Sequence, residues 1–229
     1  MIFDPTYFLF LTPALLLSLW ATFKTKSAFK KYSRVPASRG LTGAQAAAEM
    51  LRRAGVDGVR IVATEGFLSD HYNPATRTLA LSPAVHSQRS IAAIGVACHE
   101  AGHALQHAAN YAPLWVRTAL VPTASIGSSV GYLVMLLGLF LSSVNMVLIG
   151  AALFSAVLLF QIVTLPVEFN ASRRAKRLAV EYGLVTDDER RGLAKVLNAA
   201  AMTYVAAAFS TLMTLLYFLF RAGVLGDRD

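Results

Sequence analysis

Four stretches of this 229-residue chain are each long enough and apolar enough to cross a bilayer, and this constrains the fold more than any other feature. A helix needs about 20 predominantly apolar residues to span the hydrocarbon core. Hydrophobic residues make up 55% of the chain, charged residues only 15%, and the mean hydropathy is +0.52. The sequence therefore predicts a mainly α-helical, multi-pass membrane protein with about four transmembrane helices. These helices are expected over residues 5–23, 120–141, 146–165 and 199–220.

The positions of lysine and arginine predict the orientation of these helices. Basic residues crowd residues 24–39 and 173–177, directly after the first and third stretches, whereas the loop at 142–145 carries no charge. Because cytoplasmic flanks hold the excess of Lys and Arg, residues 24–112 and 166–198 are expected to form the cytoplasmic region. The first stretch has no small-residue cleavage site before Lys24, so we interpret it as a retained anchor.

The net charge of +8 also bears on the kind of partner. The basic residues gather beside the predicted membrane helices and lack an interleaved aromatic surface. This pattern favours the bilayer, through anionic lipid headgroups, and argues against nucleic acid.

The segment His99-Glu100-Ala101-Gly102-His103 carries the chemistry. On a helix, residues four apart share one face with about 6 Å of axial rise between them, so both imidazoles can reach one ion. Glu100, beside them, can accept a proton from water at that ion. This is the His-Glu-x-x-His pattern of zinc proteases. Gly102 costs ~1 kcal/mol relative to Ala inside a helix, which predicts the close approach of another backbone.

Glu168 is the expected third metal ligand, at the start of a helix that leaves the membrane. A catalytic zinc ion takes three protein ligands and keeps one position for water, and two His with one Glu is a standard set. The alternative is that Glu168 only complements the helix dipole. A third histidine on the same straight helix diverges too far for a tetrahedral site. Residues expected near the ligands, or at the surface in the case of His107, are Asn170, Ser172, Arg173 and His107.

The cytoplasmic region is expected to be a zincin-like α+β arrangement, with short strands beside the zinc-binding helix. An amphipathic helix is predicted to end at Ala54, followed by strands at 59–63 and 77–81 with Asn73-Pro74 as turn residues between them. Ser87 or Ser90 is expected to cap the helix that carries the motif.

Two features of this region suggest substrate contacts. Zinc proteases commonly hold an extended substrate by backbone pairing with a strand edge, so Thr78, Leu79 and Ala80 are predicted to bind substrate. The alternative is an ordinary packed strand. His71 is predicted to meet a substrate carbonyl or the developing oxyanion, with turn packing as its alternative.

Several segments together resemble the YugP family of bacterial membrane zinc metallopeptidases. They are the zinc motif, Leu68-Ser69-Asp70-His71-Tyr72-Asn73-Pro74, Pro166-Val167-Glu168-Phe169-Asn170-Ala171-Ser172, and Leu197-Asn198-Ala199-Ala200-Ala201. The resemblance covers nearly the whole chain, and the family is similar in plan to HtpX-type membrane proteases. Their third zinc ligand lies in a Glu-x-x-x-Asp pattern, which falls on Glu168 here with Ser172 in place of the Asp.

The resemblance implies Zn²⁺ as cofactor and a polypeptide substrate that is a membrane or membrane-proximal protein. It also implies location in the bacterial inner membrane, with a role in membrane-protein quality control.

The sequence thus predicts a zinc-dependent endopeptidase that acts at the cytoplasmic membrane face. Zinc would lower the pKa of a bound water toward ~7, and Glu100 would act as general base and then general acid. The main alternative is a non-catalytic zinc-binding scaffold or regulator, against which Glu100 argues because a structural site needs no base. An intramembrane protease and a transporter are further alternatives, the latter disfavoured by the few ionisable residues in the apolar stretches.

Overall fold

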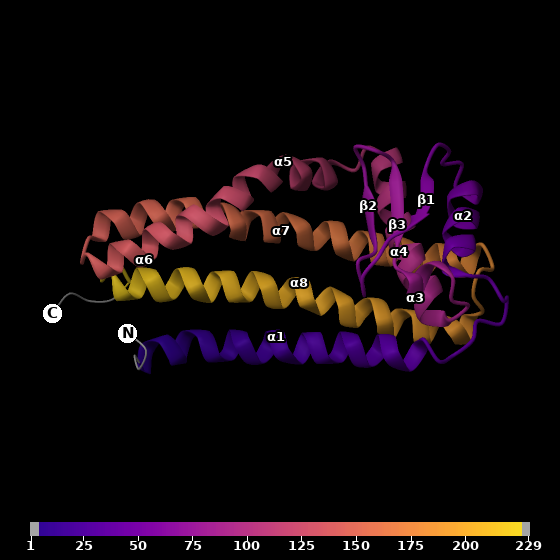
Figure 1. Cartoon of the computed structure of the whole chain (residues 1–229), viewed down its shortest axis with the longest axis horizontal. Coiled ribbons are helices and arrows are strands. Elements are labelled where there is room, and N and C mark those ends of the chain that lie inside the picture. The colour runs from indigo at the N-terminus through magenta and orange to yellow at the C-terminus, as the bar shows by residue number, and fades with distance from the viewer. Residues whose placement is uncertain (1–4, 226–229) are drawn as a thin grey trace. The chain divides into compact units, whose positions relative to one another are not determined.

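The structure is a computed structural model that describes residues 5–225 (Figure 1). It divides into two compact units. The helical unit comprises, within the described part of the chain, residues 5–21, 115–165 and 203–225. The mixed unit comprises Thr22–Leu114 and Pro166–Met202. Helices α1 (Pro5–Tyr32), α7 (Val144–Glu181) and α8 (Asp187–Arg221) contribute residues to both.

Within residues 5–225, four helical stretches are long and apolar enough to cross a membrane, as predicted: Pro5–Tyr32, Ala112–Phe140, Val144–Glu181 and Asp187–Arg221. Three of them contain one of the apolar stretches found in the sequence, and Ala112–Phe140 contains all of the stretch 120–141 except its last residue. The second consists of α5 (Ala112–Ile126), a π-helical turn (Gly127–Gly131) and α6 (Tyr132–Phe140), so a π-helical turn interrupts the helix predicted over 120–141. All four helices extend well beyond the apolar stretches, and α7 carries Glu168 within one uninterrupted helix.

The helical unit exposes large apolar side chains and packs closely at glycines. Leu9 and Phe140 are more than 70% exposed, while the buried cluster is small and centres on Met135, Val147 and Phe218. A Cβ atom added to Gly131 would lie 2.7 Å from the backbone nitrogen of Phe154 in α7. Small residues that let backbones approach are typical of helix packing in lipid, where burial of apolar surface gives no drive. The unit therefore has the surface and the packing of a membrane-embedded bundle.

The mixed unit contains a three-stranded sheet in the order β1-β3-β2. β3 (Thr78–Leu81) pairs in parallel with β1 (Arg60–Ala63) and antiparallel with β2 (His71–Asn73). Sequence reasoning found β1 and β3 but missed β2. Because β3 is the central strand, its backbone groups pair on both sides. The prediction that Thr78, Leu79 and Ala80 offer a free edge to a substrate is therefore wrong.

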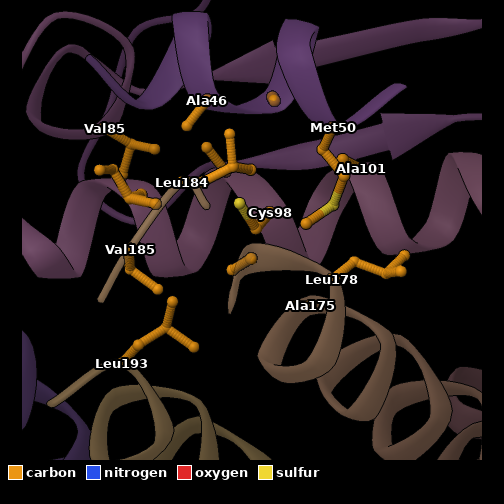
Figure 2. Packing of buried hydrophobic residues seen from close by; sticks show 14 of the residues in the cluster. Ala46, Met50, Val85, Cys98, Ala101, Ala175, Leu178, Leu184, Val185 and Leu193 are labelled. Carbon is orange, nitrogen blue, oxygen red and sulfur yellow. The ribbon is translucent and has the colours of Figure 1, made fainter. Parts of the chain in front are cut away.

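Helix α4 (Ile91–Ala108) runs through the core of the mixed unit (Figure 2). On one side it packs against α2 (Gly43–Arg53), which begins at the capping box of Thr42 and Gln45. On the other side it meets α7 and α8. The buried side chains around it include Ala46, Met50, Val85, Cys98, Ala101, Ala175, Leu178 and Leu193. The short helix α3 (Pro83–His86) joins β3 to α4. The helix with the metal-binding motif is thus fixed by contacts along both faces.

Candidate metal centre

Helix α4 places the two histidines of the motif one turn apart. It begins after Ser90, whose hydroxyl oxygen accepts a hydrogen bond from the Ala93 backbone N–H at 3.2 Å. This selects one of the two caps predicted from the sequence. The ring centroids of His99 and His103 lie 4.8 Å apart. Both rings therefore lie on one face of α4, as the spacing predicted.

Gly102 allows α7 to reach this face. A Cβ atom at position 102 would lie 2.8 Å from the backbone oxygen of Ala171 in α7, a distance that carbon atoms do not tolerate. The close backbone approach predicted from a glycine inside the motif is confirmed. Since Glu168 is one turn before Ala171 on α7, the same contact brings its carboxylate to the histidines.

Three ligand atoms converge at this point. The Glu168 Oε2 atom lies 3.2 Å from His99 Nε2 and 3.5 Å from His103 Nε2. One donor atom from each of the three residues lies within 4.8 Å of the others. Ligands held about 2.0–2.2 Å from a tetrahedral zinc ion are separated by about 3.3–3.6 Å. The donor set, two imidazole nitrogens and one carboxylate oxygen, and its spacing thus fit zinc.

The electrostatics of the cluster also favour a cation. Glu168 is 2% exposed. Burial favours its neutral acid, but the hydrogen bonds and charges of His103 and His99 outweigh this and lower the pKa of the carboxyl well below its usual range. Burial acts against charge on His103 too, yet Glu168, with help from Glu100 and Gln106, raises the pKa of that imidazole. The site is therefore built to hold positive charge beside a buried carboxylate, which a divalent ion supplies better than a proton.

Gln106 fixes the orientation of His103 and was not found from the sequence. Its amide nitrogen donates to the Val167 carbonyl at 2.8 Å and to Asn170 Oδ1 at 3.0 Å, so both of its N–H groups have acceptors. Its oxygen, 3.0 Å from His103 Nδ1, can only accept. Hence Nδ1 carries a proton, and Nε2 faces Glu168 and the metal position, where an ion would take the place of the proton on Nε2.

Ser172 plays the corresponding part for His99. Its hydroxyl lies 3.1 Å from His99 Nδ1, so a hydroxyl stands where the HtpX-type pattern has a carboxylate. Asn170 supports Gln106 and also accepts a hydrogen bond from Arg174 Nε at 2.8 Å. Ser172 thus contacts His99 directly, whereas Asn170 contacts Gln106, the partner of His103.

The other predicted site residues lie in different surroundings. Glu100 is 8% exposed, and its charge acts on His103. His107 hydrogen-bonds to the hydroxyl of Tyr72 through Nδ1 at 2.8 Å. Arg173 is exposed and lines a cavity among other basic residues. His71 is exposed at the start of β2, with Nδ1 2.9 Å from the Ser69 carbonyl oxygen. Its substrate role stays a prediction.

The role of Gln106 near the ligands could have been predicted from the sequence. It lies three residues after His103 on an apolar helix, so it shares the face of the ligands. It is also fully buried, and a buried amide needs partners for all its polar groups.

Comparison with known proteins agrees with this geometry. The model of the family described as "Putative neutral zinc metallopeptidase" matches residues 7–223. The chain is 50% identical over 212 residues to the "Putative membrane protease YugP" of Bacillus subtilis (strain 168), which covers 92% of this chain and 94% of that protein. No solved structure gives a significant match. The family match spans the positions of His99, His103 and Glu168 and extends across both units.

Proposed function

The chain belongs to this family of neutral zinc metallopeptidases, and we propose that it is an endopeptidase whose single zinc ion is held by His99, His103 and Glu168. The observation that carries the proposal is the convergence of these three ligands from α4 and α7. Glu100 follows His99 directly in the chain, and its charge acts on His103. Three protein ligands leave one position of a tetrahedral zinc ion for water, which is the arrangement of catalytic and not of structural zinc sites.

Each of these residues has a separate role in the proposed peptide hydrolysis. Zinc, when bound, polarises the substrate carbonyl and makes a water molecule more acidic. Glu100 takes the proton of the attacking water and delivers it to the leaving amine. Gln106 holds the imidazole of His103 in its ligating tautomer, and Ser172 orients the imidazole of His99 through a hydrogen bond at Nδ1. The buried carboxylate of Glu168 would offset one of the two positive charges of the ion.

The edge of β2 is the proposed place for an extended substrate. β2 is an edge strand of the sheet, so the side away from β3 offers backbone groups to pair with a polypeptide. The Tyr72 hydroxyl ties β2 to His107, one turn beyond His103 on α4. His71, exposed at the start of β2, is proposed to contact a substrate carbonyl. The position of β2 beside α4, the helix with the two histidine ligands, supports a zincin-like arrangement.

We further propose that the site faces the cytoplasm at the bacterial inner membrane. Lys24, Lys26 and the basic residues at 173–177 follow apolar stretches, as cytoplasmic flanks do. Glu168 lies only three residues after Leu165, the end of the third stretch. Membrane or membrane-proximal proteins are therefore the proposed substrates, and quality control of membrane proteins the proposed role.

Replacement of Glu100 by glutamine tests the catalytic part of this proposal. Because glutamine cannot accept the proton, cleavage of a fluorogenic peptide by the purified full chain should fall by about 100- to 10,000-fold, while zinc content stays at one ion per chain. Glu49→Gln, which changes a partly exposed ion pair on α2 outside the metal cluster, is the matched control and should leave both unchanged. Equal turnover by the wild-type chain and Glu100→Gln would refute the assigned role. If the wild-type chain binds zinc but cleaves no peptide, the alternative function, a non-catalytic zinc-binding scaffold or regulator, would be favoured.

A further inference from the structure

A cavity between α7 and α8 of the mixed unit is lined mainly by cationic side chains. Its volume is about 760 Å³. The lining residues from α7 are Arg173, Lys176 and Arg177, and those from α8 are Asp187, Arg190, Arg191 and Ala194. Five cations thus face one carboxylate. This excess of positive charge is concentrated on two neighbouring helix surfaces.

The contacts within the cluster leave this charge largely uncompensated. Lys176 Nζ donates to Asn198 Oδ1 at 2.9 Å, a neutral partner. Burial, together with repulsion from Arg173 and Arg190, lowers the pKa of Lys176. Arg177 Nε lies 3.8 Å from a Glu181 oxygen, but both side chains are more than half exposed, and such pairs contribute little. The cluster therefore carries mutual repulsion that an anionic ligand would relieve.

The geometry of arginine narrows the chemistry of that ligand. Guanidinium groups present paired N–H donors that match the oxygens of a phosphate, and several of them can share one phosphate group. A carboxylate also fits one guanidinium, but it has fewer oxygens to satisfy a cluster. A phosphate-bearing group is thus the best complement to this lining.

The positions of the cavity-lining residues along the chain indicate which kind of molecule supplies the phosphate. Arg173 follows Leu165 by eight residues, and Arg191 precedes Ala199 by eight. Eight residues of helix rise about 12 Å, and the headgroup region extends about 5–8 Å beyond the hydrocarbon core on each side. Long basic side chains can cover the remaining distance by reaching back toward the interface. Basic pockets between membrane helices are known to suit anionic headgroups.

We propose that this cavity binds the phosphate of an anionic phospholipid headgroup. The inference does not rest on proteolysis, because it concerns residues outside the metal cluster. The proposal also assigns Arg173 to phosphate binding, whereas the sequence suggested that it lies near the zinc ligands.

Native mass spectrometry of the detergent-solubilised full chain tests this proposal. Short-chain phosphatidylglycerol and phosphatidylcholine are the lipid probes, and soluble glycerol 3-phosphate supplies the same phosphate without a lipid anchor. The cavity variant Arg173→Gln/Arg190→Gln is compared with Arg60→Gln/Arg89→Gln, which removes two exposed arginines elsewhere on the mixed unit. All four positions are exposed, so both variants should fold, as circular dichroism can verify.

We expect the wild-type chain to bind phosphatidylglycerol at least tenfold more tightly than phosphatidylcholine. The cavity variant should lose at least tenfold in phosphatidylglycerol affinity, whereas the control variant should keep it within about twofold. Equal losses in both variants would mean general surface attraction and would overturn the proposal. Glycerol 3-phosphate binding as tightly as the lipid, and lost in the cavity variant, would identify a soluble phosphate ligand and would overturn the lipid assignment.

Discussion

In the helical unit the close backbone contacts at glycines lie beneath an exposed apolar surface, whereas in the mixed unit such contacts, at Gly43 and Gly102, lie within a closed core of alanine, leucine and methionine side chains. The one glycine contact that matters most in the mixed unit, Gly102 against Ala171, lies at the metal cluster. The comparison teaches that close backbone approach serves two purposes here. In the helical unit it replaces the missing hydrophobic drive, and in the mixed unit it positions ligands.

The strongest test of this comparison is Gly102→Ala. The added methyl group meets the α7 backbone, which cannot move aside as a side chain can, so we expect a loss of about 1–3 kcal/mol in unfolding free energy and loss of bound zinc. Thermal denaturation and metal analysis measure these effects. Gly95→Ala is the matched control on the same helix, since its Cβ meets only the flexible Leu193 side chain, at 3.2 Å. Full zinc content in Gly102→Ala would contradict the positioning role.

The counterpart in the helical unit is Gly131→Ala. Its Cβ would lie 2.7 Å from the Phe154 backbone nitrogen, so a destabilisation of about 1–3 kcal/mol is again expected. Zinc affinity, however, should stay within about threefold of the wild-type value, because all three ligands belong to the mixed unit. Isothermal titration of the metal-free chain can measure it. A large loss of zinc would show that packing in the helical unit controls the site.

Replacement of Gln106 by leucine should have an intermediate effect confined to the metal. Removal of partners that orient a ligating histidine typically lowers metal affinity by about 10- to 100-fold. Leucine also leaves the Val167 carbonyl without its partner, so Gln106→Glu, which keeps an acceptor for His103 Nδ1, is a useful second variant. It should retain more zinc affinity than Gln106→Leu. The tautomer itself can be read from the ¹⁵N chemical shifts of His103, which should lose the Nδ1–H form only in the leucine variant.

The smallest effect concerns the start of α8, where Glu189 joins three segments. It accepts hydrogen bonds from the backbone and hydroxyl of Ser38 and from the Thr186 backbone. Burial acts against its charge, but these bonds lower the pKa of Glu189 below its ordinary value of 4.5. The resulting stability is present above the ordinary pKa and is lost as pH falls through the lowered one.

Glu189→Gln should therefore cost about 1 kcal/mol near pH 7, the usual effect of losing a helix cap, and should have a shallower loss of stability in acid. Denaturant melts between pH 7 and pH 3 provide the comparison. Parallel pH profiles for the two proteins would count against this account.

The sequence predicted the structure best where apolar residues form long runs, and where a residue such as glycine inside a helix has few structural explanations. Runs of apolar residues predicted the four long apolar helices. The motif predicted that His99 and His103 share one face, and its internal glycine predicted the close approach of another backbone, which the structure identifies as α7. Thr186 and Glu189 have the spacing of a capping box and form one at the start of α8.

Features that depend on tertiary placement could not be read in this way. Strand β2 has three residues, too few for an alternating pattern, and the central place of β3 follows only once β2 is known. Arg173 lies one residue after Ser172, yet on a helix this turns it about 100° away, toward the basic cavity and not toward His99.

X-ray absorption at the zinc K-edge of the purified chain tests the central claim most directly. The account predicts one zinc ion per chain with only nitrogen and oxygen neighbours at about 2.0–2.2 Å, and loss of that ion in Glu168→Gln. A sulfur neighbour at about 2.3 Å, or unchanged zinc coordination in Glu168→Gln, would contradict it.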